Sequence, residues 1–464
     1  MTSRRARALA VYLVMAGLAS SAGAGEATAP KGFIDDSLSN GLQVTILPDS
    51  SLPVVATRLW YHVGGANEAA DQRGFAHLFE HLMFGGTLTY PEGTWENHVH
   101  RFGGYENAET WNDETRFEST IDPEGFPEVL AMEADRMRNL SLDSTGLERE
   151  KRIVTEELRG DIENDPVLRA LADAMKAACN GHPYALTPLG TKEDIARATL
   201  PRVCDFYDRY YRPNNAHLVI VGPVEARATW KMVERLFGPI PRGGASPPAV
   251  PPLISWKFRM DTRLVEDIPP VNVAVLAYPM PPPSTRDEPA LVVMRTLLGG
   301  EQIDPFKEDL VRRRNQAVEA GCRTVLAREG GVMCLFSAVL PYRSERGQFA
   351  VMNETVHQLA RMEWLTDARL EGVKRGLLRS IEHRRYTAGE LADAVAEYRW
   401  WRGDSRLAFE QANEIAAVSK HDVQAVFERY VVQASPAHVY ARPEHVPVLL
   451  WLFGWLYPLV SRWF

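Results

Sequence analysis

The sequence has little cysteine. Four cysteines occur among 464 residues, and none of them forms a C-x-x-C pair. Because cysteine-bound zinc sites use such closely spaced pairs, the sequence argues against a metal site of that kind. Cys322 and Cys334 flank a predicted hairpin and are one candidate disulfide, and Cys179 with Cys204 is another. Buried free thiols are the alternative for all four.

An excess of positive charge is also missing. Lys and Arg number 52 against 60 Asp and Glu, which gives a formal net charge of −8. The first 24 residues carry three Arg and no acid, so removing them takes the net charge to −11. Binding to a nucleic-acid backbone depends on clustered cations. We therefore expect no nucleic-acid partner.

The C-terminus lacks an apolar run long enough to span a membrane. Residues 446–460 are nearly all apolar, but Pro447 and Pro458 interrupt them. The run is also shorter than the roughly 20 residues that a membrane-spanning helix needs. Contact with a membrane surface, contact with a partner and core packing are the alternatives for this tail, residues 441–464.

The N-terminus has the pattern of an export signal. Three Arg among the first seven residues precede an apolar run over residues 8–19, and an A-x-A cleavage pattern follows at residues 22–24. We predict a signal peptide over residues 1–24, and hence a location in the periplasm of a Gram-negative bacterium. A retained membrane anchor is the alternative. Because the periplasm is an oxidising environment, disulfides could form in an exported chain.

The most informative motif is H-x-x-E-H, formed by His77-Leu78-Phe79-Glu80-His81. On a helix, residues i and i+4 share a face, so His77 and His81 can bind one zinc ion. Glu80 stays close to that face, where its carboxylate can take a proton from a zinc-bound water. A surface helix with two solvated histidines is the alternative, because so short a motif also arises by chance.

A third zinc ligand is expected from elsewhere in the chain, since catalytic zinc usually has three protein ligands and one water. The charged segment 148–157 contains Glu150 and Glu157, seven residues apart and therefore on one helix face. Glu157 can be the ligand, and Glu150 can lie behind it and orient a histidine. An ordinary solvent-exposed charged helix is the alternative.

These motifs resemble the pitrilysin, insulinase and mitochondrial processing peptidase family of zinc endopeptidases. The resemblance covers nearly all of the chain after the predicted signal peptide, and it is densest in the blocks at residues 39–44, 64–68 and 74–87. It implies one Zn²⁺ per chain and a reaction that hydrolyses peptide bonds in short or unfolded peptides. In that reaction Glu80 is the general base.

The resemblance also assigns the remaining site residues. It implies Glu157 as the third ligand, 76 residues after His81, and an outer-shell role for Glu150. Residues 104–110 resemble the edge strand to which a substrate peptide adds as an extra strand, and Asn107 and Ala108 are its implied binding residues. A plain β-edge is the alternative. We expect structural or surface roles for three other histidines: His98, His100 and His182.

The chain divides into two halves of similar size. A Pro/Gly-rich linker at residues 241–256 separates a predicted zinc-binding domain, residues 31–240, from a zinc-free domain, residues 257–440. Residues 290–300 repeat the zinc-helix block without its ligands, with Leu291, Met294 and Arg295 in place of His77, Glu80 and His81. We predict an α+β fold of two homologous domains, each a mostly antiparallel sheet packed with helices. The resemblance implies that they form half of a clamshell that encloses peptides.

One part of the family's pattern is missing. Its active members use an Arg and a Tyr seven residues apart, supplied by a zinc-free domain that faces the site. Here Val311 and Val318 stand at those positions, and no Tyr follows Arg312 at the required spacing. A small misalignment is one explanation. The other is a dimer in which a related zinc-free chain supplies the pair. Two competing functions are a catalytically silent scaffold subunit and a membrane-tethered binding module.

Overall fold

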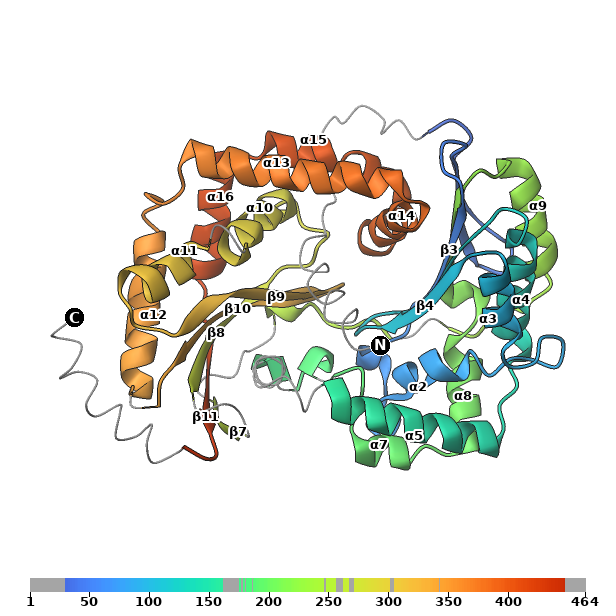
Figure 1. The fold of residues 1–464 in the computed structure, drawn as a ribbon, viewed down its shortest axis with the longest axis horizontal. Coiled ribbons are helices and arrows are strands. Elements are labelled where there is room, and N and C mark those ends of the chain that lie inside the picture. Colours follow the sequence, from blue (N-terminus) through green and yellow to red (C-terminus); the bar gives the residue numbers. More distant parts are fainter. Residues whose placement is uncertain are drawn as a thin grey trace.

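The computed structural model describes most of the chain between residues 30 and 446. The described ranges are 30–161, 175–176, 178–179, 181–185, 187–245, 248–255, 262–266, 271–300, 304–341 and 343–446. The predicted signal peptide and residues 447–464 of the apolar tail lie outside them. Figure 1 shows two lobes, each built from one sheet and several helices. In the part of the chain so described, no helix has the length and apolar content needed to cross a membrane.

The first lobe contains a six-stranded sheet in the order β1-β2-β6-β3-β5-β4. Its strands are β1 (Ile34–Ser37), β2 (Gln43–Pro48), β3 (Val55–Tyr61), β4 (Tyr105–Thr110), β5 (Thr115–Ile121) and β6 (Ala216–Gly222). The pair β2–β6 is parallel, and the other pairs are antiparallel. Every residue of the central strands β3 and β6 is buried, because both faces of the sheet are covered.

Helices of the same half cover one face of this sheet. They are α2 (Phe75–Leu82), α3 (Thr94–Arg101), α4 (Phe126–Asn139), α5 (Ser144–Asp161), α7 (Lys192–Ala196), α8 (Leu200–Tyr210) and α9 (Ala226–Phe237). Leu59 and Leu218 of the sheet share one core with Phe79 of α2 and Phe206 of α8. This core holds α2 against the sheet next to β4.

The second lobe repeats the topology of the first. Its strands are β7 (Thr262–Glu266), β8 (Asn272–Met280), β9 (Glu319–Ala327), β10 (Gly330–Val339) and β11 (Ala437–Pro443). Their order, β7-β11-β8-β10-β9, matches β2-β6-β3-β5-β4 strand for strand, and β7–β11 is the corresponding parallel pair. Its helices are α10 (Glu288–Gly299), α11 (Pro305–Lys307), α12 (Glu345–Leu359), α13 (Asp367–His383), α15 (Gln411–Ala417) and α16 (Lys420–Phe427). The predicted α+β fold of two homologous domains is confirmed.

Each half of the chain also covers the second face of the other half's sheet. Helix α14 (Ala388–Arg402) belongs to the second half in sequence, yet it packs on β3 and β6 of the first sheet. Figure 1 shows it beside β3. Leu391 and Val395 of α14 share a core with Trp60 of β3 and Val219 of β6. In return, Cys179 and Tyr184 of the first half pack against the second sheet. The domain bounds at residues 240 and 257 stay a prediction, but the packing crosses them.

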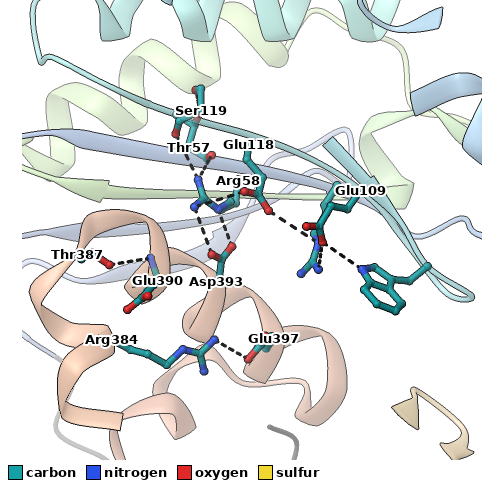
Figure 2. A network of polar contacts seen from close by, with 12 residues as sticks. Thr57, Arg58, Glu109, Glu118, Ser119, Arg384, Thr387, Glu390, Asp393 and Glu397 are labelled. Atoms are coloured by element: carbon teal, nitrogen blue, oxygen red, sulfur yellow. Dashed lines mark hydrogen bonds and ion pairs between the residues drawn. The ribbon is translucent and has the colours of Figure 1, made fainter. Parts of the chain in front are cut away.

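A buried ion pair joins α14 to the first sheet (Figure 2). Arg58 Nε on β3 donates to Asp393 Oδ1 at 2.6 Å, and Arg58 Nη2 donates to Asp393 Oδ2 at 3.3 Å. The Arg58 side chain is 6% exposed and that of Asp393 is 14% exposed. Arg58 Nη1 also donates to the backbone oxygen of Thr57. Asp393 is therefore the closer counter-charge of the guanidinium, and Glu118 Oε2 lies farther from it, at 3.8 Å from Nη2.

Asp393→Ala is expected to lower the free energy of unfolding by up to about 3–5 kcal/mol, because the buried Arg58 cation loses its closest partner and the Glu118 carboxylate, 3.8 Å away, compensates its charge less closely. Thermal or denaturant unfolding measures this change. Glu390→Ala is the matched control on the same helix, because the Glu390 side chain is 46% exposed. The control is expected to change stability by less than about 1 kcal/mol. Equal losses in the two variants would contradict the role given to the Arg58–Asp393 pair.

The β4–β5 turn meets the tip of the β9–β10 hairpin. Asp113 accepts the Arg328 N–H at 2.7 Å and the Tyr184 hydroxyl at 2.8 Å, and the Glu329 N–H donates to the Tyr184 oxygen at 3.0 Å. Beside it, Glu114 accepts from Trp400 Nε1 on α14 at 3.3 Å. Burial raises the pKa of Asp113 to about 6 and the pKa of Glu114 to about 8. The contact between the β4–β5 turn and the β9–β10 hairpin therefore contains two carboxyl groups whose ionisation is unfavourable.

Glu114→Gln is expected to stabilise the protein at high pH. The pKa of Glu114 is about 8 in the fold against an ordinary value of 4.5, so the folded state keeps a proton that the unfolded state releases. The contribution of Glu114 to the free energy of unfolding of the parent protein therefore falls as pH rises between these two pKa values, by about 1.4 kcal/mol for each pH unit. Above the higher pKa this contribution no longer changes with pH. Unfolding at about pH 5 and about pH 9 should show the variant's advantage at the higher pH. The exposed-site control Glu124→Gln should show no such difference, and a pH-independent effect of Glu114→Gln would contradict the argument.

The described cysteines are free thiols. In the β9–β10 hairpin, which was predicted from sequence, Cys322 stands opposite Leu335 and Cys334 stands opposite Arg323. Opposed residues share a face and adjacent residues alternate, so Cys322 and Cys334 point to opposite faces of the sheet. This geometry excludes a bridge between them.

Candidate metal centre

The H-x-x-E-H motif lies on α2, whose start is fixed by close backbone contacts. Gly74 precedes the helix with φ of 79°, a conformation that favours glycine. A Cβ on Gly190 would lie 2.8 Å from the Cα of Gly74, so the two glycine backbones pack directly together. The Glu68 carboxylate accepts the N–H groups of Gly74 at 2.7 Å and Ala76 at 2.8 Å. These contacts set the position from which His77 and His81 project.

The three predicted ligands converge from α2 and α5. One ligand atom each of His77, His81 and Glu157 lies within 4.8 Å of the other two. Glu157 Oε2 is 3.2 Å from His81 Nε2 and 3.7 Å from His77 Nε2. Ligand atoms about 2.1 Å from a tetrahedral zinc lie about 3.4 Å apart, so these separations fit a zinc ion. Two imidazoles and one carboxylate are also a donor set that zinc accepts.

The two histidines have different surroundings. Burial, and then the charge of His81, lower the pKa of His77 to about 4, so its imidazole is neutral, as metal binding requires. Burial alone would lower the pKa of His81, but hydrogen bonds to Glu150 and Glu157 raise it to about 9, so a metal ion would have to displace a proton from that ring. On the far side of His81, Nδ1 lies 3.6 Å from Glu150 Oε2. Burial alone would raise the pKa of Glu150, but hydrogen bonds from His81 and Arg149 lower it below its ordinary value. Glu150 therefore stays ionised beside the His81 ring, as the predicted orienting residue would.

Glu80 lies outside the ligand cluster but on the same helix. Its Oε2 accepts a hydrogen bond from the Thr110 hydroxyl at 2.8 Å. Burial raises the pKa of Glu80 to about 7. A carboxylate with a pKa near neutrality can both accept and release a proton at ordinary pH.

Strand β4 runs beside α2 at the edge of the first sheet. It pairs with β5, and no other described strand pairs with its second side. Ala108 is buried on the α2 face, whereas Asn107 stands opposite Glu118 on the other face. The structure thus places both predicted substrate-binding residues on a free edge next to the ligand cluster.

The other predicted residues lie elsewhere. His98 Nε2 contacts the backbone oxygen of Gly125, His182 Nε2 contacts that of Pro251, and His100 is exposed beside Glu106. None of the three histidines belongs to the ligand cluster of the described chain. Val311 packs against the core of the second lobe, and Val318 is 55% exposed just before β9.

Sequence reasoning missed two residues of the site. Glu68 holds the start of α2, and Thr110 contacts Glu80. Both lie within segments singled out from the sequence, but neither contact follows from residue spacing. The signal available for Thr110 was strand alternation, which places it on the same face as Ala108.

The sequence is similar to known zinc proteases. The family model for insulinase, peptidase family M16, matches residues 44–192, and the model for the peptidase M16 inactive domain matches residues 197–377. The zinc protease PqqE of Helicobacter pylori is 27% identical over 371 residues, which are 78% of this chain and 82% of PqqE. The probable zinc protease PqqL of Escherichia coli is 26% identical over 275 residues, which are 56% of this chain but only 29% of PqqL.

Solved structures share the fold. The crystal structure of a protease from Helicobacter pylori aligns with a TM-score of 0.80 and 24% identity, over 90% of this chain and 100% of that chain. The periplasmic protease PqqL from Escherichia coli aligns with a TM-score of 0.68 and 17% identity, over 92% of this chain and 50% of that chain. The two family models together match most of residues 44–377, which include parts of both lobes. The chain belongs to peptidase family M16.

Proposed function

We propose that this chain is a zinc-dependent endopeptidase that hydrolyses short or unfolded peptides bound in an extended conformation. The observation that carries the proposal is the meeting of His77, His81 and Glu157 within 4.8 Å, with Glu80 on the same helix. Relatives described as zinc proteases support it. The ligand set is complete in this chain, which favours an enzyme over a silent scaffold subunit.

The residues divide the chemistry among them. His77, His81 and Glu157 would hold one zinc ion, and Glu150 would orient the His81 ring. Zinc, when bound, lowers the pKa of a water ligand and polarises the scissile carbonyl. The Glu80 carboxylate would accept a proton from the attacking water and pass it to the leaving amine.

Substrate recognition is assigned to the free edge of β4. A peptide that adds as a strand gains backbone hydrogen bonds without requiring particular side chains. Ala108 contributes backbone groups, and Asn107 presents its side chain on the opposite face from the ligand cluster. This mode suits unfolded or short peptides, because most extended segments of a folded protein are already paired or packed.

The proposal includes a second chain and an exported location. Val311 and Val318 occupy the positions where an Arg/Tyr pair is expected, so a related zinc-free chain would supply that pair in a dimer. The relative PqqL, described as a periplasmic protease, supports a periplasmic location. The arrangement makes this chain the metal-binding subunit of a two-chain peptidase.

The test measures zinc content and peptide cleavage together. The chain without residues 1–24 is purified, its zinc is measured by atomic emission, and a mixed peptide library is incubated with it. The incubation is made with the chain alone and with the related zinc-free chain. We expect one zinc per chain and cleavage that requires the second chain.

The other outcomes separate the alternatives. Cleavage by the chain alone would mean that a homodimer suffices and that no zinc-free partner is needed. Zinc without cleavage under either condition would contradict the endopeptidase proposal. Absence of both zinc and cleavage would favour the scaffold subunit.

A further inference from the structure

We propose that Thr110 is a positioning residue for Glu80, and that it links the orientation of this carboxylate to the strand that binds the peptide. The inference rests on the proposed function, in which Glu80 is the general base. Thr110 is the last residue of β4, and its hydroxyl donates to Glu80 Oε2 at 2.8 Å. The next acceptor, the backbone oxygen of Ala76, is 3.5 Å away, so the carboxylate is the main partner.

The hydroxyl matters because a carboxylate turns easily about its last torsion. Rotation about the terminal bond of a glutamate side chain has broad minima, so burial alone does not fix the direction of the two oxygens. A hydrogen bond to Oε2 fixes the plane of the group and leaves Oε1 to accept a proton. A catalytic base must lie within hydrogen-bond reach of the proton it takes, and small misplacements reduce its rate.

The backbone of Thr110 faces the side of β4 where a peptide would add. The backbone N–H of Trp111 donates to the backbone oxygen of Glu114 at 2.8 Å. Glu109 stands opposite Arg116 in the same ladder. In an antiparallel ladder, alternate residues direct their N–H and C=O groups to the same neighbour. Glu109, like Trp111, therefore bonds to β5, while Ala108 and Thr110 direct their backbone groups to the free edge. One residue thus contacts both the peptide edge and the base.

The opposite face of β4 is held in place, which limits how Thr110 can move. The Glu109 carboxylate pairs with the Arg116 guanidinium and accepts from Trp111 Nε1 at 3.3 Å. The Arg116 guanidinium also lies over the Trp60 ring, 5.2 Å from its centroid. Figure 2 shows Glu109 beside Glu118, in the network that continues through Arg58. Because this network holds the end of β4, the Thr110 hydroxyl stays aimed at Glu80.

The test compares Thr110→Val with Thr110→Ser in the full chain, with the second chain present if cleavage needs it. Valine keeps the branched shape but removes the hydroxyl, and serine keeps the hydroxyl. We expect Thr110→Val to lower kcat by about 10–100-fold with KM changed by less than about threefold, the size found when an orienting partner is lost. Thr110→Ser is expected to stay within about threefold of the parent in kcat. Zinc content should stay at one per chain in both.

Crystal structures of the zinc-loaded parent and both variants give a second readout that needs no turnover. The Glu80 carboxylate is expected to rotate in Thr110→Val and to keep its orientation in Thr110→Ser. Thr120→Val on β5 is the matched control, because Thr120 stands opposite Tyr105 at the far end of the hairpin. This control should change neither kcat nor the Glu80 orientation.

Three results would overturn the inference. An unmoved Glu80 carboxylate in Thr110→Val would do so whether or not the enzyme turns over. An unchanged kcat in that variant would also do so, and so would loss of zinc in Thr110→Val and Thr110→Ser alike, which indicates a purely structural role. An inactive zinc-loaded parent would instead contradict the proposed function, and the crystal structures would still decide whether Thr110 orients Glu80.

Discussion

Glu80→Gln is expected to lower kcat by about 10²–10⁴-fold, the range attributed to a positioned general acid or base. The amide has the shape of the carboxylate and can still accept the Thr110 hydrogen bond, but it cannot take a proton from water. Glu80 is not one of the three clustered ligands, so the variant should keep one zinc per chain. Steady-state cleavage of a defined peptide and atomic emission on the same sample measure both quantities.

The control for this prediction is Glu148→Gln. Glu148 lies on α5 and its side chain is 61% exposed, so removing its charge should leave both zinc and turnover unchanged. Full activity in Glu80→Gln would contradict the assignment of Glu80 as the general base. Loss of zinc in Glu80→Gln would mean that the carboxylate serves the metal rather than the proton transfer.

His77→Ala is expected to lose the metal as well as the activity. The variant leaves His81 and Glu157 as two ligands, which is one fewer than catalytic zinc sites use. We expect zinc affinity to fall by more than about 100-fold, which exceeds the effect of losing an outer-shell partner. Competition with a chelator of known affinity measures the change, and peptide cleavage should fall with zinc occupancy.

His100→Ala is the matched control for His77→Ala. The His100 side chain is 66% exposed and lies outside the ligand cluster. The His100→Ala variant should bind zinc with the same affinity as the parent. If His77→Ala binds zinc as tightly as the parent does, the three-residue site is wrong and the metal, if any, is held elsewhere.

Local periodicity was enough to predict the elements that carry the site. The i, i+4 spacing of the two histidines and the seven-residue spacing of Glu150 and Glu157 each describe one helix, and α2 and α5 are those helices. The meeting of the two helices was not predictable from spacing. It came from the family resemblance, because the contact between Glu157 and His81 spans a long stretch of chain.

Helix α14 shows what the sequence does not reveal. A helix on a surface shows an apolar stripe from which its packing face can be predicted. Buried residues of α14, including Leu391, Ala396 and Glu397, lie around the whole helix, so no stripe marks the face that meets the first sheet. The partner sheet lies more than 160 residues earlier in the sequence. The contact from Thr110 to Glu80 was missed for a related reason, since alternation gives a face but not a partner.

The exchange of covering elements has a consequence for how such a chain can evolve. A gene cut in the middle would encode a first half whose β3 and β6 lack the apolar cover of α14, and the exposed apolar surface would favour aggregation. The reciprocal loss of Tyr184 and its neighbours would leave the second sheet uncovered in the same way. Once each of two duplicated halves covers the sheet of the other, deletion of either half would expose the apolar face of the remaining sheet. A half without metal ligands would then be retained because its helix α14 covers the sheet of the other half.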